Sequence, residues 1–226
     1  MATLKLAPTL LNSFDFYMHC PENWKSRAWE GLTSAIKRKP FTPTHEIQKG
    51  LKFEDAVQKR VEGCKTFGWN LWDLPGSTEF KTVAHHCMDG KFQVWGRKSY
   101  DVPGYGEVLT QGKADVLFTA GSEKWKDGKI IDLKTTGNFK DERKYTESWQ
   151  HLFYCKFWDI PYFQYIVAVW ESPESEKISQ VKSINMSIDL DSAEERIVEH
   201  TKLFFQWLNL NNLWDDYYHT YCKNPR

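Results

Sequence analysis

Two carboxylates and a lysine lie in stretches of this chain that otherwise predict buried β-strand. Asp115 belongs to the run KADVLF, and Asp132 and Lys134 belong to the run KIIDLKTT. Residues two apart in a strand point to the same side, so Asp132 and Lys134 share a face while Ile131 and Leu133 point the other way into the core. If the two runs form a hairpin, Asp115 comes to lie beside Asp132.

A pair of acidic side chains of this kind is typical of a divalent metal site. Two neighbouring carboxylates repel each other, and both lose hydration when they are partly buried. A divalent cation removes that conflict, and Mg²⁺ needs only one or two protein carboxylates because it keeps several waters. A lysine on the same face then orients a water or stabilises charge on a phosphate. An isolated Asp-x-Lys is more often a simple salt bridge, so the metal interpretation depends on further residues.

Three further features favour the metal interpretation. Gly112 permits a bend or a close backbone approach just ahead of the first acidic residue. Gln150 and Tyr154 are four residues apart in a predicted helix and therefore share one of its faces. Glu54 lies on another predicted helix. Each of these features taken alone is ordinary helix or strand surface, and only their combination indicates a site.

The elements that must position these residues follow from turn residues and from hydrophobic periodicity. Helical spacing, prolines and caps predict helices over residues 9–20, 22–39, 44–63 and 146–160. Thr44 is the expected N-cap of the third helix and Gly63 its expected stop. Ser192 begins a capping-box spacing, which predicts that the helical C-terminal segment starts there.

The middle of the chain predicts strands. Stretches rich in β-forming residues, bounded by turn residues, predict strands over residues 92–102, 113–118, 129–136, 162–170 and 178–189. The run 162–170 is apolar enough to be buried on both faces. This order of elements predicts a mixed α/β domain with a central mixed sheet flanked by helices, in which the strand after the 146–160 helix pairs parallel with the preceding meander. We expect one domain over residues 1–226, with the helical N-terminal region, residues 1–65, integral to it.

The charge balance argues against a general polyanion binder. Thirty Lys and Arg balance thirty Asp and Glu, so a nucleic-acid site must be a local patch. Residues 25–39 and 124–144 are basic, and they form either a phosphate-binding track or ordinary solvated faces. Trp24, Trp69 and Trp72 are candidates for stacking on unpaired bases, although most of the eleven tryptophans are expected in the core.

The sequence favours a cytoplasmic protein with reduced thiols that does not engage a membrane. The first 14 residues lack the basic start and apolar core of a signal peptide, and the most apolar run, 165–170, is far too short to span a bilayer. The five cysteines are odd in number and include no CxxC pair.

Two other kinds of site are set aside on spacing. A zinc site would use a group that lacks ordered pair spacing: Cys64, His85, His86 and Cys87. The run PGYGEVLTQG has neither P-loop nor dinucleotide-binding spacing.

The motifs GLKFED, GKAD, IIDLKTT and QHLFY, in this order, resemble the PD-(D/E)XK nuclease superfamily. The RecB-type exonuclease branch, which includes phage recombination exonucleases and CRISPR-associated adaptation nucleases, is also similar in its opening, which is LAPTLLNSFDFYMHCPENWKSR here. The resemblance covers residues 6 to about 170. It implies a restriction-endonuclease-like core and a Mg²⁺- or Mn²⁺-dependent DNA exonuclease of phage or bacterial recombination or repair, with DNA and possible recombination proteins as partners.

The resemblance also implies a role for each residue of the strand pair. Asp115 is the first metal-binding carboxylate and Asp132 the second, and the backbone carbonyl of Leu133 is a further ligand. Lys134 is the implied catalytic lysine, which places or activates the attacking water. No covalent enzyme intermediate is needed for such a hydrolysis.

Two helices complete the implied site. Glu54 occupies the helical position where relatives have an acidic residue or histidine, and Asp55 beside it is a competing candidate. Gln150 and Tyr154 stand at a QxxxY position near the active centre and the DNA backbone.

A cluster-bearing branch of the same family has one early cysteine and three late ones. Cys20 and Cys222 match the outer two positions, but the late CxxC…C group is missing. We therefore expect no iron–sulfur cluster. Two alternatives stay open: an endonuclease of the same superfamily, and a non-catalytic DNA-binding or subunit-interaction module that keeps the fold. The sequence leaves the oligomeric state open.

Overall fold

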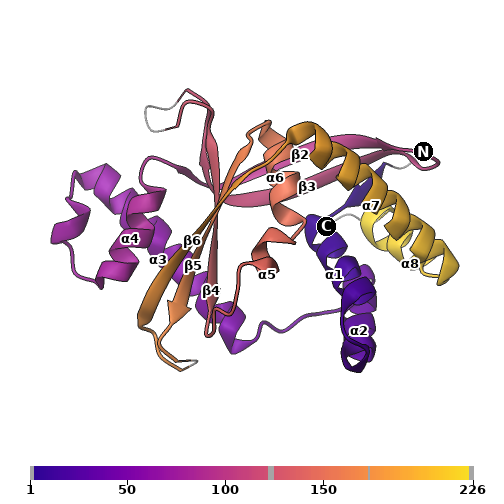
Figure 1. The fold of residues 1–226 in the computed structure, drawn as a ribbon, viewed down its shortest axis with the longest axis horizontal. Helices are drawn as coiled ribbons and strands as arrows, with labels where there is room; N and C mark the ends of the chain where they lie inside the picture. Colours follow the sequence, from indigo (N-terminus) through magenta and orange to yellow (C-terminus); the bar gives the residue numbers. More distant parts are fainter. Residues whose placement is uncertain (1–2, 122–124, 173, 224–226) are drawn as a thin grey trace.

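A mixed β-sheet with helices on both sides organises the chain (Figure 1). The structure, a computed structural model, describes residues 3–121, 125–172 and 174–223. Across these residues the strand order is β1-β3-β4-β5-β6, with β2 paired to β3. The strands are β1 (Leu4–Leu6), β2 (Lys91–Val102), β3 (Gly106–Phe118), β4 (Lys129–Thr136), β5 (Tyr162–Trp170) and β6 (Ile178–Ser187). The predicted mixed α/β class is confirmed.

The helices lie before, between and after the strands. They are α1 (Pro8–His19), α2 (Lys25–Ile36), α3 (His45–Phe67), α4 (Thr78–Cys87), α5 (Arg143–Thr146), α6 (Gln150–Trp158), α7 (Leu190–Leu210) and α8 (Trp214–Tyr217). Short turns of helix add η1 (Glu22–Trp24), η2 (Leu71–Asp73) and η3 (Tyr218–Lys223). Within the described residues, no helix is long and apolar enough to cross a membrane.

The sequence predicted one end of α3 correctly and the other end wrongly. Thr44 is the N-cap as predicted, because its side chain accepts a hydrogen bond from the backbone N–H of Ile47. The predicted stop at Gly63 is wrong, and the helix continues to Phe67. A glycine inside a helix costs only about 1 kcal/mol, and Gly68, with φ +66°, provides the left-handed cap instead.

The start of α7 also differs from the prediction. Ser192 is not its N-cap. Asp189 caps the helix, accepting hydrogen bonds from the backbone N–H groups of Asp191 and Ser192 at 3.0 and 3.2 Å. An ionised carboxylate interacts favourably with a helix N-terminus, so Asp189 starts the helix earlier than the capping-box spacing indicated.

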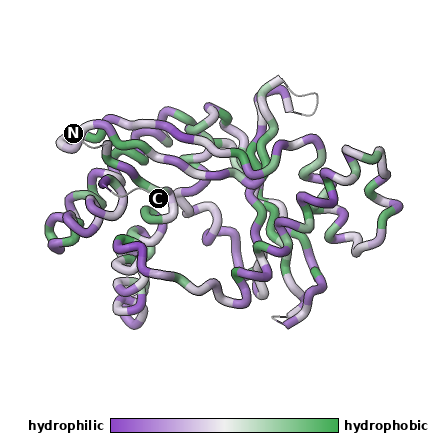
Figure 2. The backbone as a smooth tube through the Cα atoms, turned by 180° about the vertical axis from the view of Figure 1, so that it is seen from behind, coloured by the Kyte–Doolittle hydropathy of each residue, from purple (hydrophilic) through white to green (hydrophobic). Residues whose placement is uncertain are grey.

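Two hydrophobic cores cover the two sides of the sheet. One core joins the sheet to α1, α2, α6 and α7, and the other joins it to α3 and α4. Figure 2 shows the same arrangement from behind, with hydrophobic segments gathered where the strands cross. The sheet is therefore buried on both faces in its centre, as the apolar β5 predicted.

The strands β3 and β4 pair over a short stretch and then separate. They form the predicted hairpin through the pairs Val116–Ile131, Leu117–Ile130 and Phe118–Lys129. Beyond these pairs β4 continues in parallel with β5, as predicted, while the same edge of β3 pairs with β1 over residues 108–110. Residues 111–115 of β3 thus face an opening between β1 and β4.

At this opening, the two faces of the β2–β3 hairpin exchange the sides to which they point. Ala114 points into the α6 core, whereas Val116, two residues on, points into the α3 core. The β2–β3 ladder skips Gln93 and Asp115, between the pairs Phe92–Val116 and Val94–Ala114, and Gln93 has a left-handed φ of +54°. Side chains two apart in a regular strand point the same way, so this irregularity reverses the faces of the hairpin. Asp115 lies at the reversal.

Candidate active site

Asp115 and Asp132 lie side by side where β3 and β4 separate. The Asp115 carboxylate accepts a hydrogen bond from the backbone N–H of Leu133 at 2.8 Å. This bond takes the place of a ladder bond at the point where the strand pairing ends. The carbonyl of a strand residue lies on the same edge as its N–H, so the Leu133 carbonyl also faces the opening.

Asp132 is the most deeply buried member of the site, with 1% of its surface exposed. One of its oxygens forms an ion pair with the Lys134 ammonium, and the other accepts a hydrogen bond of 2.9 Å from the amide of Gln150. Asp132 and Lys134 therefore share a face, as predicted. The salt bridge proposed as the simpler alternative is present too, so it coexists with a gathering of further polar groups.

Helix α6 brings Gln150 and Tyr154 to the strands. Gln150 donates a second hydrogen bond to the hydroxyl of Tyr154 at 3.0 Å, and that hydroxyl donates to the backbone carbonyl of Lys113 at 2.9 Å. Tyr154 thereby occupies part of the opening in the edge of β3. The predicted shared helical face is confirmed, and it points to the carboxylates.

Two opposed glycines allow α6 to come this close. Gly96 and Gly112 are cross-strand partners on the face of the hairpin that α6 covers. A methyl group on Gly112 would lie 2.7 Å from the ring of Tyr154, and one on Gly96 would lie 2.6 Å from the ring of Trp158. Contacts this short are not tolerated between carbon atoms, so glycine is required at both positions.

Helix α3 provides a third carboxylate. Gly50 lets this helix approach the end of β4, where an added methyl group would lie 3.1 Å from the Thr135 hydroxyl. One turn later, Glu54 is half-buried and within electrostatic range of Asp132 and Lys134. The competing candidate Asp55 is exposed and pairs with Lys59 at 2.7 Å, so it points away from the site.

Burial disfavours the ionised forms of all three carboxylates. Burial raises the pKa of Asp115 well above its usual range, and the neighbouring Asp132 raises it further. Burial likewise raises the pKa of Asp132, against the opposing effect of Lys134. Burial also raises the pKa of Glu54, although Lys134 and Lys113 partly offset the shift. Such a cluster of acidic groups stores negative charge that a cation would neutralise.

Lys134 responds to the same charges in the opposite sense. Burial lowers its pKa, but the attraction of Asp132 and Asp115 outweighs burial, and the net shift is upward. The Tyr154 hydroxyl also stays protonated, because burial and then Asp132 raise its pKa to about 12. Lys134 and Tyr154 are therefore a cation and a neutral hydrogen-bond donor at neutral pH.

The oxygen-rich donor set has the chemistry that a hard divalent cation requires. The buried Oδ2 atom of Asp132 makes no hydrogen bond, although it is paired with the Lys134 ammonium. Within the described residues, however, no three metal-binding side chains converge closely enough to hold an ion as they stand. A cation bound at Asp132 Oδ2 would take the place that the Lys134 ammonium holds there.

A hollow opens beside Lys134 on the side of α1 and α5. It has a volume of about 200 Å³ and is lined by Asn12, Lys134, Thr135, Lys144, Tyr145, Ser148, Gln150 and Tyr165. A second hollow of about 450 Å³ shares Asn12, Lys144 and Ser148 with it and adds Arg143 and His19. The basic stretch at 124–144 thus contributes Arg143 and Lys144 next to the site, while Lys124 lies outside the described residues.

One residue at the site was not singled out from the sequence. The Asn12 side-chain oxygen accepts hydrogen bonds from the backbone N–H of Trp149 at 2.7 Å and from the Ser148 hydroxyl at 3.4 Å. The Ser148 hydroxyl in turn accepts from the backbone N–H of Gln150 at 3.2 Å. Asn12 therefore ties the start of α6 to α1 and fixes the helix that carries Gln150. It stands in the opening LLNSF, the one sequence feature that pointed toward it.

The remaining candidates lie elsewhere. Trp24, Trp69 and Trp72 are exposed, but Trp69 stacks on Phe67 at 4.7 Å, and Trp72 lies against His85 at 5.9 Å at the α3–α4 end. All five cysteines are free and buried.

Comparison with solved structures finds similar folds at low identity. The protein designated SSO0001 is 12% identical with a TM-score of 0.49, over 90% of this chain and 76% of that one. LHK-Exo from Laribacter hongkongensis, in complex with dAMP, is 11% identical with a TM-score of 0.48, over 92% and 89%. A phage-related exonuclease from Haemophilus somnus 129PT is 14% identical with a TM-score of 0.44, over 92% and 96%. A scan of protein-family models and a search of curated proteins found no match.

Proposed function

We propose that this chain is a PD-(D/E)XK-type nuclease that hydrolyses DNA phosphodiester bonds with Mg²⁺ or Mn²⁺. The observation that carries the proposal is the convergence of Asp115, Asp132, Lys134 and Gln150 where β3 and β4 separate. The acidic side chains and the ammonium group lie together beside a hollow that Lys134 and Lys144 line. That combination suits a substrate which carries negative charge on a phosphate.

Asp115, Asp132, Glu54 and the Leu133 carbonyl are the groups that would hold the ion. When bound, such an ion supplies positive charge that polarises the phosphate and activates water. Lys134, released from its pairing with Asp132, lies on the same face and is placed to orient water and to stabilise negative charge on the phosphate. Gln150 keeps Asp132 in position, because its amide donates to the oxygen that Lys134 does not contact.

The overall change is a simple hydrolysis. Water adds to phosphorus, the bond from phosphorus to one ester oxygen breaks, and that oxygen takes up a proton. The products are a phosphate monoester and a free hydroxyl. None of the site residues needs to form a covalent bond with the substrate, which agrees with a site built from acidic groups, an amine and an amide.

We further propose that digestion starts at DNA ends, as in recombination or repair. The opening beside Lys134 is small, and the hollow that continues from it runs along α1 and α5. A single strand entering from an end fits such a passage more readily than an intact duplex. An endonuclease of the same superfamily is the alternative, and linear and circular substrates separate the two.

The proposal is tested by incubating end-labelled linear DNA and closed circular DNA with the protein and Mn²⁺. We expect labelled products from the linear DNA and no cutting of the circle. Lys134→Ala should lower the rate by a factor of about 10² or more. The matched control is Lys98→Ala, because Lys98 also pairs with an aspartate, Asp159, but does so at the surface away from the site. Equal rates for the parent and Lys134→Ala would refute the proposed site.

A further inference from the structure

The outer face of the β2–β3 hairpin is a second feature of the site region. Along these strands one set of side chains packs under α6, beginning with Gly96 and Gly112. The alternate set points away from α6 and is exposed except for the half-buried Leu109. Trp95 belongs to this outer set, and with 66% of its surface accessible it is the most exposed tryptophan of the described chain.

Cations flank this tryptophan. Lys113 is the cross-strand partner of Trp95, and both side chains are exposed. Directly opposed residues in an antiparallel pair have Cβ atoms about 5 Å apart. Arg97, two residues along β2, is exposed on the same face, opposite Gln111. The register thus gives Trp95 a lysine directly across the strand pair and an arginine two residues along its own strand.

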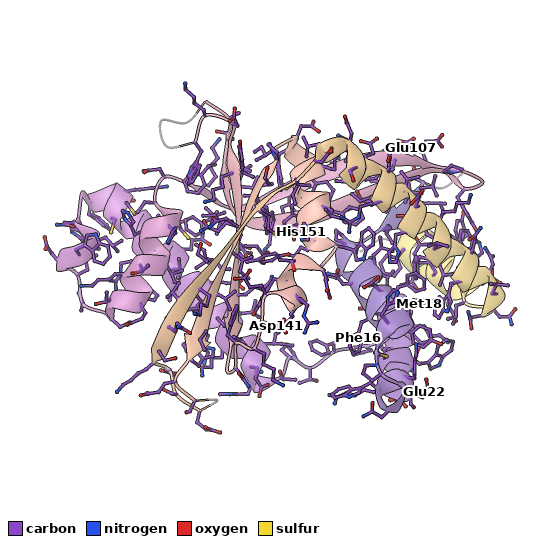
Figure 3. The ribbon with its side chains drawn as sticks, in the orientation of Figure 1. Phe16, Met18, Glu22, Glu107, Asp141 and His151 are labelled. Carbon is purple, nitrogen blue, oxygen red and sulfur yellow. The ribbon has the colours of Figure 1, made fainter. Side chains whose placement is uncertain are left out.

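The charge of this face changes along the hairpin. The half that adjoins the carboxylates carries Arg97 and Lys113. At the far end, two acidic residues, Asp101 and Glu107, are cross-strand partners. Figure 3 labels Glu107 toward that end, away from His151 of α6 beside the site. A polyanion lying on this face would therefore be attracted to the half nearest the carboxylates and repelled at the tip.

The basic half is continuous with the site. Lys113 precedes Asp115 by two residues, which is about 7 Å along a strand. It also lies within electrostatic range of Glu54, whose pKa it lowers against the raising effect of burial. This outer face therefore begins on the α3 side of the opening, whereas the hollow lined by Arg143 and Lys144 lies on the α1 and α5 side.

We propose that this outer face, defined by Trp95, Arg97, Gln111 and Lys113, binds an unpaired stretch of the DNA strand next to the bond that is cut. This proposal rests on the proposed nuclease function and specifies the form of DNA that the nuclease takes. A base stacks on the Trp95 indole, and the phosphates on either side meet Lys113 and Arg97. Aromatic rings between cations are the usual means of holding single strands without reading their sequence. Because the chain has no net charge, such a local arrangement is how it would attract DNA.

The experiment measures DNA binding rather than cutting. A fluorescent duplex with a four-nucleotide single-stranded overhang, and the same duplex with blunt ends, are titrated with the full chain in EDTA and followed by anisotropy. We expect the parent to prefer the overhang and Trp95→Ala to bind it about tenfold more weakly. Trp95→Phe should bind within about threefold of the parent, because a stacking ring remains. Arg97→Ala should reduce the dependence of log Kd on log salt by about one phosphate contact.

The matched control is Trp72→Ala, which removes an exposed tryptophan at the α3–α4 end. We expect its affinity to equal that of the parent. Parent-like binding of the overhang by both Trp95→Ala and Arg97→Ala would overturn the proposal. So would a change in the mass of Trp95→Ala in light scattering without a change in DNA binding, because the face would then join two copies of the chain. If Trp95→Ala loses binding but the parent cuts no DNA, the outer face binds DNA as proposed and the nuclease proposal falls.

Discussion

The Asp115 carboxylate accepts a hydrogen bond of 2.8 Å from the backbone N–H of Leu133, at the residue where β3 and β4 stop pairing. This bond links the two strands beyond Val116–Ile131, the last pair of their ladder. It also turns an acidic group toward Asp132, against electrostatic repulsion. The local arrangement is thus unfavourable for stability and favourable for a site that recruits a cation.

That conflict predicts that neutralising Asp115 stabilises the cation-free protein. The pKa of Asp115 is raised in the folded state, so its ionised form destabilises the fold at pH values above that pKa, and the destabilisation disappears as the pH falls below the unfolded value. Asp115→Asn keeps an oxygen to accept the Leu133 N–H. We expect its free energy of unfolding at pH 7 in EDTA to rise by about 1 kcal/mol or more.

Urea unfolding measures this change, and Asp55→Asn is its matched control. Asp55 is an exposed aspartate of α3 that pairs with Lys59, and removing its charge should alter stability by less than about 0.5 kcal/mol. An Asp115→Asn variant less stable than the parent would show that the carboxylate is not strained.

Asn12 should affect turnover through α6. Asn12→Ala removes the acceptor for the Trp149 N–H and the Ser148 hydroxyl, which should cost about 1–2 kcal/mol of stability. Because α6 carries Gln150, a small displacement should also lower kcat by about ten- to a hundredfold with little change in KM. Asn12→Asp retains an acceptor oxygen and should recover most of the activity. If Asn12→Ala lowered stability alone, Asn12 would be merely structural.

Gly112 should tolerate no side chain. Gly112→Ala places a methyl group 2.7 Å from the Tyr154 ring, and relieving the overlap should cost about 1–3 kcal/mol. Gly31→Ala is the control: this exposed glycine of α2 has no atom within 4 Å of an added methyl group, and the change should stabilise the helix by about 0.5–1 kcal/mol. Thermal melts of both variants decide the matter, and similar shifts for the two would contradict the close packing of α6.

The burial of His151 predicts that the protein loses stability on acidification. Burial, reinforced by Arg196, lowers the pKa of this buried histidine from 6.5 to about 4. The unfolded chain therefore takes up a proton below pH 6.5 that the folded chain does not, so stability falls between pH 6.5 and about 4 and then levels off. The full effect is about 3 kcal/mol. Subtracting the pH profile of His151→Gln from that of the parent isolates it, and parallel profiles would show that His151 titrates normally.

The strands of the site were predictable from local pattern. The runs KIIDLKTT and YFQYIVAVW coincide with β4 and β5, since both are rich in β-forming residues and lie between turns, and the second is apolar almost throughout. The hairpin that joins Asp115 to Asp132 also follows from sequence, because few residues separate the two strands. Helix α6 was expected over residues 146–160 but begins only at Gln150, where the Ser148 hydroxyl accepts the first backbone N–H.

What the sequence missed depends on distant contacts. The three-residue strand β1 has no periodicity to detect, and it exists because it pairs with residues 108–110 of β3. Helix α4 has a short and mixed pattern that packing on α3 stabilises. The role of Asn12 and the choice of Glu54 over Asp55 also required the packed structure, because neither residue is near its partners along the chain.

The most direct test of the account is a calorimetric titration of Mn²⁺ into the parent, Asp132→Asn and Asp55→Asn. We predict saturable binding to the parent and to Asp55→Asn, and at least tenfold weaker binding to Asp132→Asn, because Asp132 is the buried carboxylate at the centre of the site. Equal Mn²⁺ affinity in the parent and in Asp132→Asn would contradict the central claim that these strands bring their acidic side chains together around a cation.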